Sequence, residues 1–112
     1  MKNLLFKTFI FSFLCIACFQ IQAQGPKVLV VTAHPDDEIL GVGATMNKLI
    51  FKYNTIVHVV ILGEGITSRS QKRDLDLWNN ELERHRSDIH EAKKHIGFQN
   101  LSIYNLPDNR FD

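Results

Sequence analysis

The feature that most constrains the fold is an alternation of short apolar runs with longer amphipathic segments. The apolar runs are Lys27 to Ala33, Thr55 to Leu62 and Leu101 to Leu106, and a high content of Val, Leu and Ile is typical of strands buried in a parallel sheet. Strands that alternate with helices lie parallel and are joined by right-handed crossovers. We therefore expect a Rossmann-like α/β fold of β-α-β-α-β order, with Lys27 to Ala33 as its first, central strand, buried on both faces.

Two segments between the apolar runs have helical periodicity. The first ends near Asn54, and its apolar residues recur at near-helical spacing: Leu40, Ala44, Leu49, Ile50 and Tyr53. The second has its apolar residues three and four positions apart: Leu75, Trp78, Leu82, His85, Ile89, Ala92 and Ile96. Gly97 directly after this second stripe is a typical helix stop. We predict two helices that cover the sheet.

The first two dozen residues differ in character from the rest of the chain. Lys2 precedes an apolar run, Leu4 to Phe19, which Lys7 interrupts, and the small residue Ala23 follows it. This layout is typical of a secretory signal peptide, because the run is shorter than the roughly 20 apolar residues that cross a bilayer. We predict a signal peptide over residues 1–23, cleaved after Ala23, and an exported protein in the periplasm or outside the cell.

Two alternatives to a cleaved signal peptide remain open. One is an uncleaved membrane anchor, and the other is a lipid attached at Cys18. The second is weaker, since Cys15 stands where a lipoprotein signal usually has an aliphatic residue. Both cysteines lie before Ala23, so the segment after the cleavage point has none and does not depend on disulfides.

Composition places the chain among ordinary globular proteins. It is 45% hydrophobic and 22% charged with a formal net charge of +1, so no nucleic-acid or acidic-polymer partner is implied. Residues 24–112 are few for a metalloenzyme with a buried site, and the last residues contain no closing element. We expect them to be the N-terminal part of a larger single domain.

A polar loop follows each predicted strand. The three loops are His34 to Glu38, Gly63 to Ser70 and Pro107 to Asp112. Because the carboxyl ends of parallel strands open on one edge of a sheet, and ligands of open α/β sheets bind there, we expect these loops to gather around one site.

The loop after the first strand, His34-Pro35-Asp36-Asp37-Glu38, carries metal-binding chemistry. His34 and Asp37 can reach one point where a strand turns into a helix, and imidazole with carboxylate suits zinc. Asp36 cannot easily share the direction of Asp37, which leaves it free as a base for an attacking water. The loop is also a good helix start, with Pro35 at the first helical position and carboxylates in the first turn. His34 favours the metal site, since a helix start needs no imidazole.

The run Val-Val-Thr-Ala-His-Pro-Asp-Asp-Glu-Ile-Leu-Gly, which includes this loop, closely resembles the opening motif of the N-acetylglucosaminyl-phosphatidylinositol de-N-acetylase family, also called PIG-L or LmbE-like. Gly63 to Arg69 and Leu106 to Asp112 resemble the second and third loops of its bacterial sugar-deacetylase branch. The resemblance runs from about Lys27 to the last residue. It implies a zinc-dependent hydrolase that releases acetate from an N-acetylated sugar or glycoconjugate and leaves a free amine.

By the same resemblance, each loop contributes site residues. His34 and Asp37 would be zinc ligands, and Asp36 would be the general base. Arg69 and Asp108 would contact the substrate, as an Arg and a carboxylate suited to sugar hydroxyls. The third zinc ligand of the family is a histidine well downstream of the third loop, in a region that this chain does not contain. The resemblance therefore predicts a site that is incomplete here.

The other histidines of the chain do not replace the missing ligand. His58 lies in mid-strand and points away from the strand's end, so we expect a packed or face-exposed strand histidine. His85 lies on the apolar stripe of the second helix, and His90 and His95 lie off it, which favours structural or solvated roles. A rival to the enzyme is a non-catalytic exported carbohydrate-binding α/β domain, or a truncated pseudoenzyme, which the missing third ligand would allow.

Two glycine-bearing segments suggest other ligands less strongly. Gly41 to Met46 resembles part of a dinucleotide fingerprint, but it lacks the third glycine and lies past the acidic loop. Small residues there would let the helix pack closely on the sheet. Gly63-Glu64-Gly65 could hold an anion, although Glu64 would repel phosphate. An exported location favours a glycan or envelope saccharide as the substrate.

Overall fold

A computed structural model describes residues 25–108 of the chain. The order of elements is β1 (Lys27–Thr32), α2 (Asp37–Tyr53), β2 (Ile56–Gly63), a 3₁₀ turn η1 (Thr67–Arg69), α3 (Leu75–Ile96) and β3 (Asn100–Leu106). The strands form a parallel sheet in the order β1-β2-β3. The predicted α/β fold with a parallel sheet is confirmed. The predicted signal peptide, with Cys15 and Cys18, and the end of the third loop, residues 109–112, lie outside the described residues.

The ends of the helices follow the signals in the sequence. At the end of α2, Asn54 adopts the left-handed conformation with φ 51°, and its N–H bonds to the carbonyl of Leu49. Gly97 ends α3 in the same way with φ 92°. Asp74 begins α3, where its carboxylate accepts a hydrogen bond of 2.9 Å from the backbone N–H of Leu77. In the part of the chain that the structure describes, no helix combines the length and the apolar content needed to cross a membrane.

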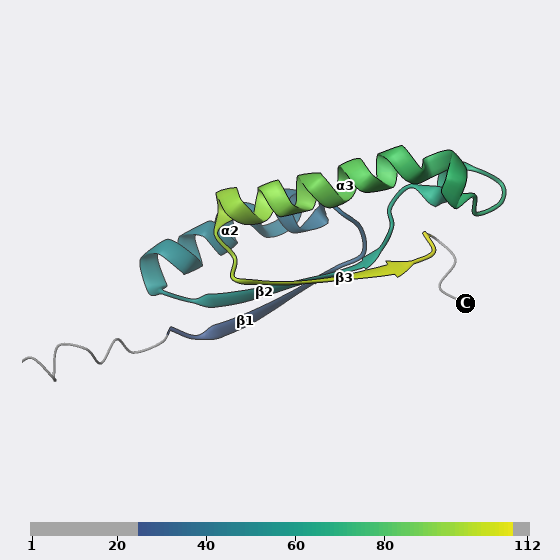
Figure 1. Cartoon of the computed structure of the whole chain (residues 1–112). Helices are drawn as coiled ribbons and strands as arrows, with labels where there is room; N and C mark the ends of the chain where they lie inside the picture. Colours follow the sequence, from purple (N-terminus) through teal and green to yellow (C-terminus); the bar gives the residue numbers. More distant parts are fainter. Residues whose placement is uncertain (1–24, 109–112) are drawn as a thin grey trace, which may run out of the picture.

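The core lies between the sheet and the two helices, which cover the same face of the sheet (Figure 1). Its buried members come from α2, β2, α3 and the segment before β3: Met46, Val57, Val59, Ile61, Ile89 and Phe98. Alternate residues of β2 are fully buried because this strand is the middle one and its helix-facing side chains meet both helices. The core therefore joins β2 to both helices beneath the carboxyl edge of the sheet.

The prediction that the first strand is central and buried on both faces is wrong for the described residues. There β1 is an edge strand, and Leu29 and Val31, on the face without helices, are 63% and 55% exposed. Both crossovers step in the same direction, so β2 becomes the middle strand and α2 and α3 share one face (Figure 1). Within residues 25–108 no helix covers the other face.

The predicted apolar face of α2 is also wrong in part, although the helix itself is where we expected it. Leu40 is 81% exposed, whereas Gly43 and Met46 are buried. A Cβ on Gly43 would lie 3.7 Å from the side chain of Ile96, an ordinary van der Waals distance, so this face of α2 lies against α3 as well as the sheet. Because Gly41 to Met46 is helix interior, the segment does not form the strand-to-helix turn of a dinucleotide fingerprint.

Candidate metal and catalytic site

Backbone hydrogen bonds tie the three loops together at the carboxyl edge of the sheet. The N–H of Gly63 donates to the carbonyl of Ala33 at 2.7 Å, and the N–H of Glu64 donates to the carbonyl of Leu106 at 3.1 Å. Gly65 has φ 74°, and a Cβ there would lie 2.9 Å from Cδ of Pro35. Glycine thus allows the second loop to lie directly against the first, and the expected gathering of the loops at this edge is confirmed.

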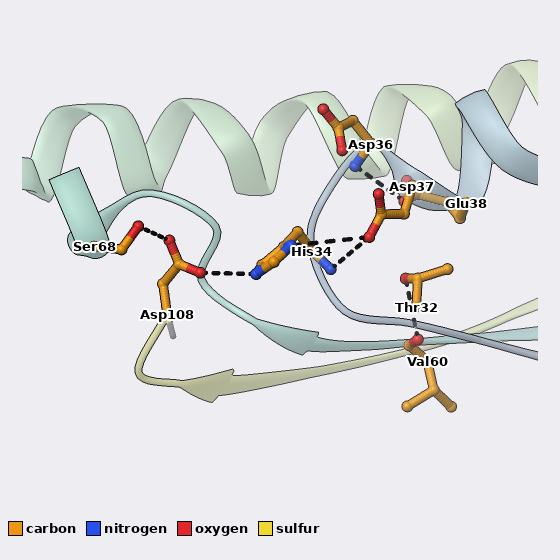
Figure 2. A network of polar contacts seen from close by, with 8 residues as sticks. All are labelled: Thr32, His34, Asp36, Asp37, Glu38, Val60, Ser68 and Asp108. Atoms are coloured by element: carbon orange, nitrogen blue, oxygen red, sulfur yellow. Dashed lines mark hydrogen bonds and ion pairs between the residues drawn. The ribbon is translucent and has the colours of Figure 1, made fainter. Parts of the chain in front are cut away.

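Asp36 occupies a strained backbone position where the first loop enters α2. Its φ of 101° is unusual for a residue other than glycine, a kind of strain that costs about 1–3 kcal/mol and is often found at functional sites. Asp36 is the N-cap of α2, but its carboxylate makes no capping hydrogen bond. Pro35 therefore precedes the cap, and the expectation that it occupies the first helical position is wrong. In Figure 2 the carboxylates of Asp36 and Asp37 point in different directions, as predicted.

Glu38 supports this backbone conformation from inside the protein. It is buried at the start of α2, and its carboxylate accepts a hydrogen bond of 3.1 Å from the backbone N–H of Asp36. Burial raises the pKa of Glu38, and hydrogen bonds from the N–H groups of Glu38 and Asp36 offset only part of that rise. Glu38 holds the loop, while the carboxylate of Asp36 is exposed and available to a ligand.

The imidazole of His34 lies between two carboxylates (Figure 2). Its Nδ1 is 3.9 Å from Oδ2 of Asp37, which also accepts a hydrogen bond of 3.0 Å from the backbone N–H of His34. Its Nε2 is 2.7 Å from Oδ1 of Asp108. The ring N–H does not point straight at that oxygen, so the contact is close but is not a well-aligned hydrogen bond.

Asp108, at the end of β3, is only 4% exposed. The hydroxyl of Ser68 donates a hydrogen bond of 2.5 Å to its Oδ2, while Oδ1 faces His34. Burial by itself raises the pKa of Asp108, but the Ser68 hydroxyl and the neighbouring imidazole of His34 outweigh it, so the pKa lies below its ordinary value. Asp108 is therefore a buried carboxylate held in its ionised form by two side-chain partners.

The donor chemistry of His34 and Asp37 fits a zinc ion. Two donors bound to one tetrahedral zinc at about 2.1 Å lie about 3.4 Å apart, close to the 3.9 Å between Nδ1 of His34 and Oδ2 of Asp37. Residues 25–108 contain no group of three His, Cys, Asp or Glu side chains that could hold a metal ion. His58 instead pairs with Ser102 at 2.9 Å, as expected of a strand histidine. His34 and Asp37 are therefore a candidate pair of donors.

Arg69 ends η1, and its side chain is exposed beside the site. The residue before it, Ser68, contacts Asp108, so the second and third loops meet directly next to Arg69. The position suits the predicted contact with a substrate that approaches from solvent.

Two parts of this region were missed by reasoning from the sequence. One is Ser68. The other is a cavity of about 170 Å³ between the first loop and α3, lined by Pro35, Asp36, Glu38, Ile39, His85, Asp88, Ile89 and Ala92. In its wall Nδ1 of His85 is buried without a hydrogen-bond partner. The signal in the sequence was a polar imidazole within an otherwise apolar helical stripe.

Fold and site together define an α/β protein with a candidate metal and base loop at the carboxyl edge of a parallel sheet. Residues 29–112 match the sequence profile of the PIG-L family, described as GlcNAc-PI de-N-acetylase. The chain belongs to this family, and the resemblance seen in its motifs is confirmed. The family's description gives N-deacetylation of a sugar as its general chemistry. No curated protein matches the chain significantly.

Among solved structures, the chain is similar to an N,N'-diacetylchitobiose deacetylase from Pyrococcus horikoshii, determined in complex with its inhibitor MPG. The TM-score is 0.64 and the sequence identity 22%, over 87% of this chain and 36% of that one. At this identity the similarity shows a shared fold. The chain thus spans about a third of the length of the solved structure that it matches.

Proposed function

We propose that the whole protein is a zinc-dependent deacetylase that hydrolyses the acetamide of an N-acetylated sugar or glycoconjugate. Membership of the PIG-L family supports the general chemistry. The observation that carries the proposal is the His34–Asp37 pair at the carboxyl end of β1, with the strained, exposed Asp36 between them in sequence. A zinc ion held by His34 and Asp37 would supply Lewis acidity, polarising the acetamide carbonyl and making water easier to deprotonate.

In this proposal the chain's own residues orient the reactants and move the proton. Asp36 accepts a proton from the attacking water, whose oxygen adds to the acetamide carbon. The tetrahedral intermediate then collapses as Asp36 returns the proton to the nitrogen, which leaves as a free amine while acetate forms. Arg69 contacts sugar hydroxyls at the rim of the site. A further protein donor for zinc comes from outside the described residues.

The test of this function is Asp36→Asn in the whole protein. Asn fits the positive φ of Asp36 and leaves His34 and Asp37 in place, so zinc content should be unchanged. Acetate release from N-acetylglucosamine oligomers should fall by about 10²- to 10⁴-fold, the usual contribution of a general base. Asp37→Asn is the matched control and should lose zinc as well as activity. Loss of zinc from the Asp36 variant would make Asp36 a ligand, and unchanged turnover would exclude it as the base.

A non-catalytic carbohydrate-binding domain is the second candidate. It is favoured by one observation, that residues 25–108 contain no group of three side chains that could hold a metal ion. Binding of the same oligomers by the whole protein without zinc and without acetate release would support this candidate over the deacetylase.

We further propose that residues 1–23 are removed during export, which is supported by the apolar run that follows Lys2 and ends before Ala23. An exported protein would meet a glycan or envelope saccharide as its substrate. Mass spectrometry of the exported protein should find Gln24 at the N-terminus. Intact Met1 in protein recovered from the cytoplasm would contradict export, and a lipid on Cys18 would show anchoring instead.

A further inference from the structure

We infer that Asp108 is a positioning residue which, together with Ser68, fixes the imidazole of His34 so that its Nδ1 faces Asp37. The inference rests on the proposed function in one respect, namely that the group held by His34 and Asp37 is a metal ion. It gives Asp108 a different role from the substrate contact that the family resemblance implies.

The surroundings of Asp108 favour an internal role over contact with a sugar. Both oxygens of its carboxylate have a close side-chain neighbour: Oδ2 accepts a hydrogen bond of 2.5 Å from the hydroxyl of Ser68, and Oδ1 lies 2.7 Å from Nε2 of His34. The residue is also almost completely buried. A sugar hydroxyl would have to displace one of these partners, whereas the exposed Arg69 is available without any rearrangement.

The same contacts give the two ring nitrogens of His34 different roles. A neutral imidazole carries its proton on one nitrogen and a lone pair on the other. A carboxylate 2.7 Å from Nε2 favours the tautomer with the proton on Nε2, which leaves the lone pair on Nδ1, the nitrogen that faces Asp37. Metal-binding histidines commonly donate their other N–H to a carboxylate, which orients the ring and makes it a better donor.

This arrangement also connects all three loops of the site. His34 follows β1, Ser68 lies in the turn after β2, and Asp108 follows β3. The direction of the His34 ring is therefore set by the register of the whole sheet and not by the first loop alone.

The experiment compares the protein with its Asp108→Ala variant at a pH where imidazole is neutral. Long-range ¹⁵N–¹H spectra of the metal-free protein should show His34 mainly as the Nε2–H tautomer, and the variant should show a mixture of tautomers. Calorimetric zinc titration should give a dissociation constant about 10- to 100-fold higher in the variant.

Asp108→Asn keeps an oxygen that accepts a hydrogen bond and should lose less zinc affinity. Ser68→Ala should shift both readouts in the same direction by a smaller amount.

Arg69→Ala is the matched control, because Arg69 lies next to Ser68 in η1 and should change neither the tautomer nor the zinc affinity. An unchanged His34 tautomer and zinc affinity in Asp108→Ala, with only the KM for the sugar raised, would overturn the inference and make Asp108 a substrate contact. Circular dichroism verifies that each variant is folded. If Asp108→Ala unfolds, the tautomer and zinc affinity of Asp108→Asn and Ser68→Ala decide whether Asp108 positions His34. The tautomer does not depend on turnover, so an inactive wild-type protein would refute the proposed function and leave this measurement intact.

Discussion

Asp36 combines a strained backbone with a side chain that makes no capping hydrogen bond to its helix. Its φ is 101°, and its carboxylate, although it occupies the N-cap, makes no capping bond. A residue selected only for folding at this position would be glycine, which adopts positive φ without strain. The strain is thus consistent with a role in binding or catalysis.

At this residue we predict that Asp36→Gly stabilises the fold and abolishes activity. The free energy of unfolding, measured with urea, should rise by about 1 kcal/mol, the lower end of the usual cost of such strain. Asn54→Gly is the matched control, because Asn54 also has a positive φ, at 51°, which asparagine tolerates well, so its gain should be smaller. A loss of stability in Asp36→Gly would show that the carboxylate supports the loop after all.

At the scale of single residues, the sequence was sufficient to predict those site residues that lie close together in the chain. His34, Asp36 and Asp37 lie within one loop, so their spacing was sufficient to group them. The roles of Ser68 and His85 could not be found in this way. Ser68 meets Asp108 forty positions away in the chain, and His85 reaches the first loop only because α3 packs beside α2. Such contacts depend on the packed fold and leave no periodic signal.

At the scale of elements, the ends of helices and strands could be predicted from the sequence. The buried side of α2 and the place of β1 in the sheet could not. Strands and helices begin and end within about a residue or two of the predicted positions, because Gly97, Asn54 and the polar loops give local stop signals. The buried side of α2 depends on the positions of the sheet and of α3 around it, and the edge position of β1 depends on the direction of both crossovers. Neither is determined by the residues of one element.

The second loop is fixed to the start of α3 by an ion pair whose removal should be costly. The carboxylate of Glu64 is 2% exposed, and its Oε1 accepts a hydrogen bond of 2.7 Å from Nε of Arg73. Its Oε2 has no hydrogen-bond partner. Glu64 therefore depends on Arg73, and its burial also explains why the loop does not present this charge to an anion.

We predict that Arg73→Ala lowers the free energy of unfolding of the whole protein by about 3 kcal/mol, because it leaves a buried carboxylate without its cation. Arg86→Ala is the control. It breaks an ion pair of 3.1 Å with Glu83 on the exposed surface of α3, and should cost less than about 1 kcal/mol. Urea unfolding of both variants gives the comparison. Equal, small losses would show that water reaches Glu64.

At the scale of the whole molecule, residues 25–108 form a sheet with one face covered by helices and one face open (Figure 1). Large apolar side chains are exposed on β1 and β3, among them Leu29, Val31, Tyr104 and Leu106. Large exposed apolar areas are rare on monomeric soluble proteins, and uncovered strand edges favour association. The same residues contain no group of three His, Cys, Asp or Glu side chains that could hold a metal ion, whereas a catalytic zinc usually has three protein donors.

We therefore predict that residues 24–112, expressed alone, bind zinc weakly, show no deacetylase activity and are marginally soluble. Zinc titration by calorimetry, acetate release from N-acetylglucosamine oligomers and sedimentation test the three parts separately. The double variant Leu29→Thr, Val31→Thr tests whether weak zinc binding results from aggregation or from a missing donor. It makes the open face more polar and leaves His34 and Asp37 untouched. It should raise solubility without improving zinc affinity, because the missing donor and not aggregation limits binding. Tight one-to-one zinc binding with turnover in either form would show that the site is complete within these residues.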